Sequence, residues 1–192
     1  MEKAEVIEFF DRRAAGWDAA MRRNEESIAA IMDHAGVRPG VRVLDVACGT
    51  GVLFPDYLER GAASVTGIDI SPEMVRIARG KFPHVETICG DVETAELSGA
   101  FDVVMVYNAF PHFPDPHRLI ERLAQLVVPG GTLSVAHGMS RGMVARHHAR
   151  HAQKVSIELP AAAELAKLFA PFFQVTAVID NDEMYQVAGV RR

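Results

Sequence analysis

The sequence has few cysteines, no long apolar run and little basic charge. Its 192 residues include only Cys48 and Cys89, whose spacing gives neither a disulfide framework nor a zinc motif. We expect both to be small, buried side chains. No apolar run reaches the length of a membrane span, and residues 1–5 lack the charged-then-apolar pattern of a secretion signal. These absences predict a cytoplasmic protein without membrane insertion.

Basic residues are outnumbered by acidic ones. The chain carries 20 Lys and Arg against 25 Asp and Glu, for a net charge of −5. A general nucleic-acid binder needs a basic footprint, so this balance argues against one and leaves room only for a local basic patch between Arg141 and Lys154. The hydrophobic fraction of 49% is that of an ordinary globular protein, and the length suits one domain over residues 1–192.

From residue 41 onward, apolar runs alternate with amphipathic segments, as in an α/β protein. The pattern predicts strands at 41–47, 64–70, 84–89, 101–107 and 132–136, helices at about 52–60, 72–81, 117–126 and 161–170, and final strands at 173–179 and 184–190. Asn181-Asp182 predicts an antiparallel turn between the last two strands. We therefore predict a Rossmann-like, doubly wound, seven-stranded sheet, mostly parallel with a C-terminal antiparallel hairpin, and helices on both faces.

The first predicted strand runs into a glycine turn, Ala47-Cys48-Gly49-Thr50-Gly51, and then a helix. Strand, glycine turn and helix are typical of a nucleotide-binding unit, and ligands of such sheets bind beyond the carboxyl ends of the strands. Phe54 stands in the sixth place of the glycine pattern, where a dinucleotide site needs a small residue. The pattern therefore disfavours NAD and FAD.

Acidic residues follow the next two strands. Asp69 can accept hydrogen bonds from ribose hydroxyls, and Asp91 can reach an adenine amino group, with Ile70 and Met74 as an apolar wall for the ring. Each acid alone would be interpreted as a solvated surface group. Their order at successive strand ends favours a nucleoside site.

Four ordered motifs, Asp45–Gly51, Gly67–Met74, Gly90-Asp91 and Val128–Gly131, resemble those of the class I S-adenosylmethionine-dependent methyltransferases. The resemblance covers roughly residues 5–137. It is closest to the small single-domain branch that includes the ubiquinone/menaquinone-biosynthesis type, and residues 9–18 resemble that branch's N-terminal lid. It implies that residues 1–36 form a helical lid and that the protein transfers a methyl group from S-adenosylmethionine to a small-molecule acceptor.

The resemblance also implies a set of cofactor-binding residues. Asp45 would bind the cofactor amine, Asp69 the ribose, and Asp91 with Val92 the adenine. Other residues would approach the methionine part or close the site, with Trp17 and either Arg12 or Arg13 acting as the cover. The complete predicted set is Trp17, Asp45, Ala47, Gly49, Thr50, Gly51, Asp69, Ile70, Met74, Asp91, Val92, Asn108 and Ala109.

Two histidines follow predicted strands on the acceptor side. His112 lies in a loop rich in proline and aromatics, and His137 follows the fifth strand. Histidine suits proton transfer near neutral pH, so both are candidate catalytic bases, should the acceptor need to lose a proton. The alternative is that each only packs or caps. Phe110 and Phe113 would shape the acceptor pocket or pack in the core.

Residues 138–160 form an acceptor-side insertion that departs from the quinone-type pattern, so that substrate does not transfer to this chain. If the segment is helical, His147 and His151 stand on one face, and His112 or His137 opposite them would make a three-histidine metal site conceivable. Alternatively, His147, His148 and His151 form a solvated face or one that recognises an acidic acceptor. A methyltransferase for a metal-bound or metalloid acceptor and a non-catalytic cofactor-binding module are the competing hypotheses. The oligomeric state is left open.

Overall fold

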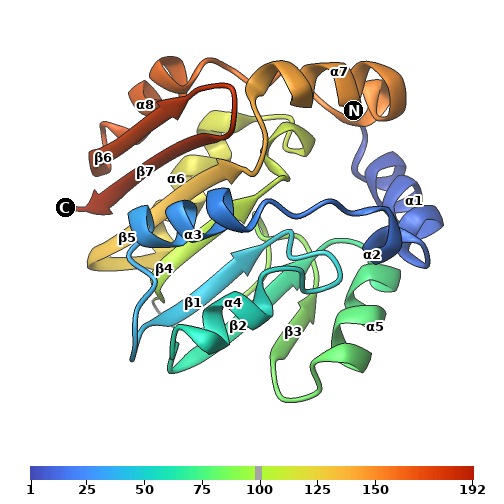
Figure 1. Ribbon diagram of the computed structural model, residues 1–192, viewed down its shortest axis with the longest axis horizontal. Helices are drawn as coiled ribbons and strands as arrows, with labels where there is room; N and C mark the ends of the chain where they lie inside the picture. Colours follow the sequence, from blue (N-terminus) through green and yellow to red (C-terminus); the bar gives the residue numbers. More distant parts are fainter. Residues whose placement is uncertain (98–100) are drawn as a thin grey trace.

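A seven-stranded sheet with the order β3-β2-β1-β4-β5-β7-β6 runs through the centre of the computed structural model, which describes residues 1–97 and 101–192 (Figure 1). The strands are β1 (Arg42–Val46), β2 (Ser64–Asp69), β3 (Glu86–Cys89), β4 (Phe101–Tyr107), β5 (Val127–His137), β6 (Phe173–Asp180) and β7 (Tyr185–Arg191). The first five are parallel, and β7 pairs antiparallel with both β5 and β6. The predicted Rossmann-like sheet with its antiparallel hairpin is confirmed.

Helices cover both faces of the sheet. They are α1 (Lys3–Ala14), α2 (Trp17–Ala20), α3 (Glu25–His34), α4 (Phe54–Glu59), α5 (Pro72–Lys81), α6 (Pro116–Leu126), α7 (Arg141–His151) and α8 (Ala162–Phe169), with short 3-10 helices η1 (Phe110–His112) and η2 (Gln153–Val155). One core packs α6 and α8 against the sheet, and a second packs α3, α4 and α5 against the other face. No helix in the described ranges is long and apolar enough to cross a membrane.

Two helices begin where the sequence predicts, because each has a side-chain cap followed by proline. The Ser71 hydroxyl accepts a hydrogen bond from the Met74 amide, and the Asp115 carboxylate accepts one from the Arg118 amide. Proline directly after each cap has no amide hydrogen to leave unpaired. These starts place both helices directly after the strand-end loops.

The fifth strand is longer than predicted. Pro129-Gly130-Gly131 lies inside β5, where the pairing with β4 shifts register between Phe101 and Val103. Gly130 has a φ of +81°, and a Cβ on Gly131 would lie 2.8 Å from the Asp102 carbonyl oxygen. The motif therefore forms a bulge inside β5, and the strand begins before this motif and not after it.

The prediction for the cysteines is half wrong. Cys48 is buried, but Cys89 is exposed. Cys89 is the last residue of β3, a four-residue strand at the edge of the sheet whose burial varies from residue to residue. Its exposure accords with its place at the end of this edge strand.

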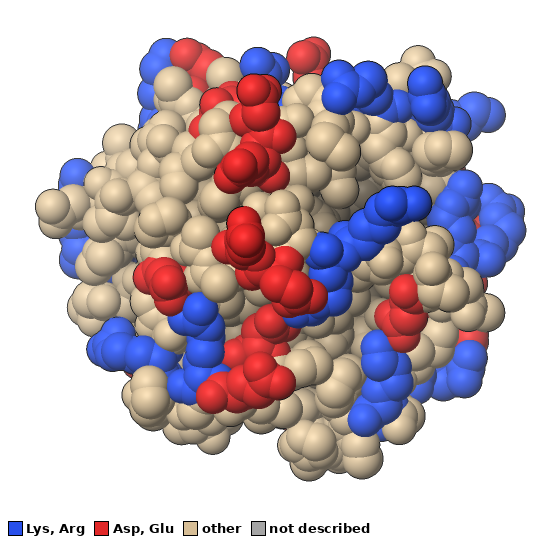
Figure 2. Space-filling view, in the orientation of Figure 1, with Lys and Arg blue, Asp and Glu red and all other residues tan. Residues whose placement is uncertain are grey.

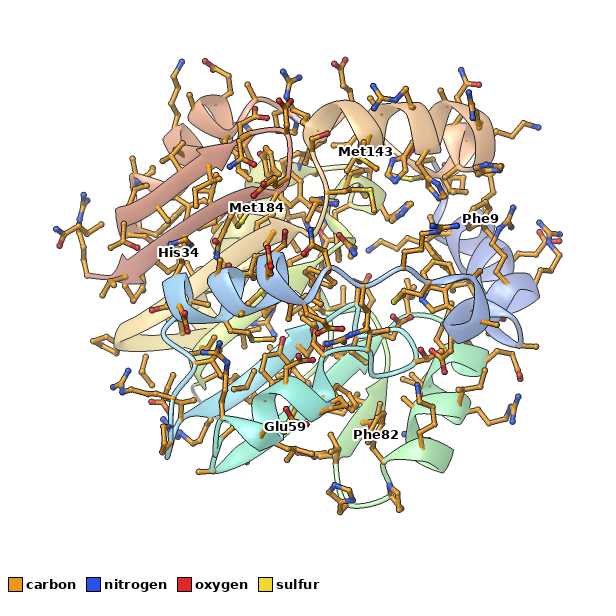
Figure 3. All side chains as sticks on the ribbon, in the orientation of Figure 1. Phe9, His34, Glu59, Phe82, Met143 and Met184 are labelled. Atoms are coloured by element: carbon orange, nitrogen blue, oxygen red, sulfur yellow. The ribbon has the colours of Figure 1, made fainter. Side chains whose placement is uncertain are left out.

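A buried polar contact fixes α3 to the C-terminal strands. The Gln186 amide donates to the Ile31 carbonyl and to the Ser134 hydroxyl, each at 3.0 Å, and its oxygen lies 2.9 Å from Nδ1 of His34. Figure 3 shows His34 at the end of α3 facing the strands of the hairpin. With α3 held to the sheet, the chain before it, α1 and α2, extends across the carboxyl ends of the parallel strands (Figure 1).

Candidate functional site

A cavity of about 1080 Å³, including its open mouth, lies at the carboxyl ends of β1, β2 and β4. Most residues predicted to bind the cofactor line it. These are Trp17, Asp45, Ala47, Gly49, Asp69, Ile70, Met74, Asp91, Val92, Asn108 and Ala109. We call residues 45–49, 69–74, 91–92 and 108–109 the strand-end rim, and the elements α1, α2, η1, α7 and η2 the covering wall.

Thr50 and Gly51 do not line the cavity, contrary to prediction. Thr50 is fully buried, and its hydroxyl donates to Asp18 at 2.5 Å. Gly51 has a φ of +80°, and a Cβ there would lie 2.7 Å from the Phe54 ring. Gly51 is therefore small because Phe54 packs against it, and Gly67 meets the same ring, with a Cβ only 2.5 Å from Phe54 Cζ.

The backbone of the rim is strained at two points. Ala47 and Asn108 have φ values of 55° and 54°, a left-handed conformation that is uncommon without glycine. Both line the cavity, at the ends of β1 and β4. A Cβ added to Gly49 would have one described atom within 4 Å, Trp17 Nε1 at 3.9 Å. A ligand therefore has room to approach this backbone.

The Asp69 carboxylate is buried and organises the glycine turn. It accepts hydrogen bonds from the amides of Gly49 and Ser71, both at 2.8 Å. Burial raises the pKa of Asp69 to about 6, although these two amides oppose the shift. Each carboxylate oxygen retains a second lone pair, so the group can also accept hydrogen bonds from hydroxyls of a ligand.

Asp45 is the most confined acid of the cavity. Only 3% of its surface is exposed. Burial raises the pKa of its carboxyl well above the ordinary value, and the negative charges of Asp69 and Asp56 add to the shift. A cationic amine in the cavity would favour the ionised carboxylate and relieve this cost.

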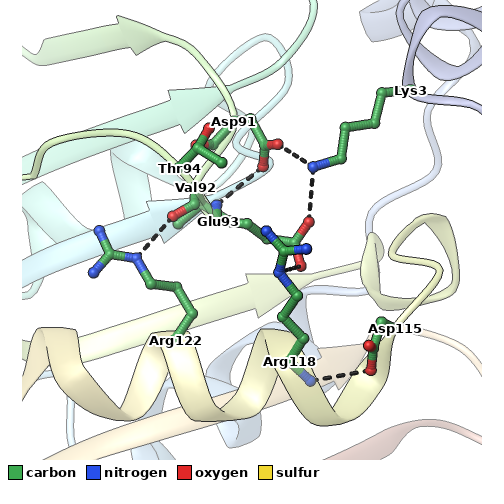
Figure 4. Close-up of polar contacts among 8 residues, drawn as sticks. All are labelled: Lys3, Asp91, Val92, Glu93, Thr94, Asp115, Arg118 and Arg122. Atoms are coloured by element: carbon green, nitrogen blue, oxygen red, sulfur yellow. Dashed lines mark hydrogen bonds and ion pairs between the residues drawn. The ribbon is translucent and has the colours of Figure 1, made fainter.

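The third acid, Asp91, is held by a residue that the sequence analysis missed. Lys3 of α1 forms ion pairs with Asp91 and with Glu93, the latter at 2.9 Å (Figure 4). Arg118 also contacts Glu93, at 3.4 Å. Lys3 lines the cavity, so α1 is fastened to the strand-end rim by a lysine. No pattern in the sequence pairs residue 3 with residues 91 and 93.

Further contacts fasten the covering wall. The Asp11 carboxylate accepts hydrogen bonds from the Ser71 hydroxyl and the Glu73 amide at the start of α5. Asp18 of α2 pairs with Lys81 at 2.7 Å, besides accepting from Thr50. Trp17 thereby stands over Gly49, with its ring 5.6 Å from that of Phe10.

Neither arginine predicted to help close the site lines the cavity. Arg12 pairs with Glu8 on the outer side of α1. Arg13 stacks over the Phe9 ring at 3.6 Å and donates to the Phe9 carbonyl. Both guanidinium groups are occupied within their own helix, and the residues of the N-terminal segment that line the cavity include Trp17, Phe10 and Lys3.

His112 lines the cavity on the acceptor side. Its Nδ1 lies 2.6 Å from the Val155 carbonyl oxygen, which can only accept, so Nδ1 carries the hydrogen and Nε2 is the basic atom of the neutral ring. Burial lowers the pKa of His112, and the charge of His147 adds to this effect, although the Val155 carbonyl opposes it. The ring is thus neutral at physiological pH and able to accept a proton.

His137 does not line the cavity. Only 2% of its surface is exposed, its Nε2 has no hydrogen-bond partner among the described residues, and its ring packs 5.9 Å from that of Tyr185. Burial lowers its pKa to about 3. The strand turns this side chain into the core behind the cavity, so only His112 has the position of a base.

The histidines of α7 do not form the conceivable metal site. In the part of the chain that the structure describes, no group of three or more His, Cys, Asp or Glu side chains is arranged to hold a metal ion. His147 and His151 do lie on one face of α7, with ring centroids 5.0 Å apart. The ring of His148 instead lies 5.1 Å from that of His112.

Tyr107 and Met21 also line the cavity and were not predicted. Tyr107 is the last residue of the apolar β4 run, and burial raises its pKa to about 12. Nothing distinguishes it from the core residues before it. Met21 directly follows the four-residue helix α2.

Comparison with known proteins identifies the kind of domain that carries this site. Residues 43–131 match a family described as "Methyltransferase domain". Over 111 residues, 53% of this chain, the sequence is 40% identical to the ubiquinone biosynthesis O-methyltransferase of Xanthomonas campestris pv. campestris. Over 130 residues, 65% of this chain, it is 34% identical to the malonyl-[acyl-carrier protein] O-methyltransferase of Acetivibrio thermocellus. The matched region spans 46% of each relative.

A solved structure shares the fold over nearly the whole chain. The N-methyltransferase NodS from Bradyrhizobium japonicum, in complex with S-adenosyl-L-homocysteine, superposes with a TM-score of 0.75 at 13% identity, covering 96% of this chain and 97% of NodS. The sheet order, the strand-end site and the family match agree with the motifs at residues 45–51, 67–74 and 90–91. Residues 43–131 are thus similar to a methyltransferase domain, and the chain shares the fold of a methyltransferase that binds S-adenosyl-L-homocysteine.

Proposed function

We propose that this protein transfers a methyl group from S-adenosylmethionine to an atom of a small-molecule acceptor that loses a proton during the reaction. One observation carries the proposal. The same cavity holds Asp45, Asp69 and Asp91 at the ends of successive strands and, beside them, a neutral histidine whose tautomer is fixed. The acids suit the donor, and the histidine suits the acceptor.

The donor fits the residues of the strand-end rim. Asp45, buried among negative charges, would bind the amine of the methionine part, and Asp69 would accept from the ribose hydroxyls. Asp91 and Val92 would hold the adenine, with Ile70 and Met74 against the ring. When bound, S-adenosylmethionine supplies a methyl group on a sulfonium. The acceptor attacks this methyl carbon in an SN2 reaction, and the thioether is the leaving group.

The cavity extends from the strand-end rim to residues of the covering wall. Its acceptor side is lined by the apolar side chains of Phe10, Met21 and Phe113. These residues would exclude water and align the acceptor with the methyl group, which is the main task of the protein in this reaction.

His112 would act as the general base. The Val155 carbonyl fixes its Nδ1–H, so the lone pair of Nε2 is available for the proton of the acceptor. The two relatives compared above are named O-methyltransferases, which supports an oxygen acceptor. The structure offers no metal group to support a metal-bound acceptor within the described residues.

The remaining predictions concern organisation and location. We propose that residues 1–192 act as one domain, with residues 1–36 as the lid and 138–160 as an acceptor-side insertion, and that the protein works in the cytoplasm. Acidic side chains gather in a band across the face shown in Figure 2, with basic side chains beside this band and toward the margins. That face gives no basic footprint for nucleic acid, which supports a small-molecule acceptor.

Two measurements test the proposal. S-adenosylmethionine and S-adenosylhomocysteine should raise the melting temperature of the protein, and NAD should not. Incubation of a metabolite extract with isotopically labelled donor should then yield a labelled small molecule. A melting temperature that responds to NAD alone would overturn the donor assignment. Donor binding without any labelled product from extract, protein or RNA would favour the non-catalytic binding module.

A further inference from the structure

Four histidines form a row from the cavity to the surface of α7. The ring centroids of His112 and His148 lie 5.1 Å apart, those of His148 and His147 6.1 Å apart, and those of His147 and His151 5.0 Å apart. His112 and His148 are half-buried, whereas His147 and His151 are exposed. The row therefore starts beside the acceptor side of the cavity and ends in solvent.

The first ring of the row is held from two sides. The Val155 carbonyl, in η2 just after α7, accepts the Nδ1–H of His112, and the Phe10 ring of α1 packs edge-on against the imidazole at 4.9 Å. Val155 and Ala152 pack with Val6 in a small apolar cluster that joins η2 to α1. These contacts keep His112 between the cavity and α7.

Neighbouring rings are close enough to exchange protons. Rings with centroids 5–6 Å apart can place their nitrogens within reach of each other through one bridging water. His112 has a single free nitrogen, Nε2, because Nδ1 is bonded to the backbone. A proton taken up there must leave by the same atom.

Other titratable groups lie near the row. His112 lines the same cavity as Asp45, Asp69 and Asp91. Burial lowers the pKa of His137 of β5, and the charges of His148 and His112 add to the shift. Burial also lowers the pKa of His147, and the charges of His151 and of Arg13 of α1 add to it. Burial lowers the pKa of His148 to about 4, with the charges of His112 and His147 adding to the shift. Neither half-buried ring thus retains a proton at neutral pH, and a proton on either is passed on readily.

We propose that His148, His147 and His151 carry to solvent the proton that His112 takes from the methyl acceptor, so that α7 is the proton exit of the active site. This inference deepens the proposed function and rests on it, because only an acceptor that loses a proton needs an exit. His112 is then the catalytic base, and His148 acts through it.

The proton balance of the step is simple. A bond forms between the acceptor atom and the methyl carbon, and the sulfur–carbon bond breaks with its electron pair remaining on sulfur. The proton of the acceptor moves to Nε2 of His112, which becomes a cation. It then passes to His148, to His147 and His151, and to water, and His112 returns to its neutral form.

The exit can be measured without knowing the acceptor. With histidine side chains isotopically labelled and the protein saturated with S-adenosylhomocysteine, NMR relaxation dispersion gives the rate at which His112 gains and loses its proton. Each protein is measured at the midpoint of its own His112 titration. We expect His148→Gln to slow this exchange on the order of tenfold. His147→Gln should slow it less, since His151 and solvent lie close by.

His117→Gln is the matched control, because His117 is an exposed histidine on α6, outside the row. It should leave the rate unchanged. Equal rates in wild type and His148→Gln would overturn the inference. If His148→Gln does not fold, His147→Gln decides, since His147 is exposed and its replacement leaves the packing intact; an unchanged rate would again overturn the exit. Failure of the proposed function shows differently, as a protein that binds no S-adenosylhomocysteine or that gives no labelled product with the labelled donor.

Discussion

The strand-end rim lines the cavity together with α1, α2 and η1 of the covering wall, but rim and wall are built in different ways. The rim lies at the carboxyl ends of parallel strands, and the pairing of the strands fixes its position. The wall joins segments far apart in the chain through single contacts, such as Phe10 of α1 with His112 of η1 and His112 with Val155 of η2. The topology of the sheet therefore positions the residues of the donor side, whereas individual side-chain contacts position those of the acceptor side.

The sharpest test of this division is loss of the proposed base. His112→Gln removes the basic Nε2 of the wall and touches none of the acids of the rim. Turnover with the acceptor found by the labelling screen should fall roughly 10²-fold or more, the usual contribution of a positioned general base. S-adenosylhomocysteine affinity, measured by calorimetry, should be unchanged. Full turnover in this variant would remove His112 from the mechanism.

Packing should tolerate an added methyl group in the wall but not beside the rim. In Gly67→Ala the new Cβ would lie 2.5 Å from Phe54 and 2.8 Å from the Cys48 sulfur. We expect a loss of about 1–3 kcal/mol in the free energy of unfolding. In Gly142→Ala, within α7, the nearest atom is at 3.5 Å and belongs to a flexible arginine, so stability should stay or rise. Urea unfolding of both variants makes the comparison, and equal losses would contradict it.

Donor binding should depend on pH through the rim. The pKa of Asp69 is raised in the folded protein to about 6, so its carboxylate is ionised above that pH and protonated below it. S-adenosylhomocysteine affinity should therefore fall as the pH drops through 6, by up to about tenfold per unit for one required ionisation. Stability of the free protein should change the other way. A raised acid pKa means that the ionised form is disfavoured by folding, and protonation between pH 6 and 4 relieves this cost.

The control for this pH dependence is Asp69→Asn, which keeps the shape of the side chain but cannot ionise. Its affinity should be lower at neutral pH, and the step near pH 6 should be absent. A step that persists in Asp69→Asn belongs to another group, of which Asp45 is the first candidate because its pKa is also raised by burial.

The smallest effect should come from the lysine that fastens α1. Lys3→Met removes the ion pairs with Asp91 and Glu93 while keeping the apolar stem. Partly exposed ion pairs contribute about 1 kcal/mol or less, so we expect only a few-fold faster release of S-adenosylhomocysteine. Salt should speed release from wild type toward the rate of the variant. Stopped-flow measurements check this, with Lys167→Met on α8, paired to Glu164, as control. Identical release rates would show that the wall does not depend on Lys3.

The same division explains what could be predicted from the sequence. Strand periodicity and the acids at the ends of the second and third strands located the sheet, Asp69 and Asp91, because local pattern and topology together determine them. Asp45 came instead from the resemblance to the methyltransferase motifs. The prediction for His137 depended on the direction in which its side chain points at the end of β5. No pattern in the sequence indicates that this side chain faces the core. Lys3 and the histidine row depend on where α1 and α7 pack, which periodicity does not encode. Thr50 and Gly51 lie outside the lining of the cavity, and the sequence could not indicate this because small residues serve packing as readily as ligands.

The contact between Phe54 and two glycines has a consequence for engineering. Gly51 and Gly67 lie far apart in sequence but are held to glycine by one phenyl ring, so neither can be exchanged while Phe54 stays. Substitutions at Gly51, Phe54 and Gly67 therefore depend on one another. A smaller residue at position 54 would remove one clash at each glycine, but Gly51 would keep its φ of +80° and a Cβ on Gly67 would still lie 2.8 Å from the Cys48 sulfur. A redesign of the turn therefore has to keep both glycines.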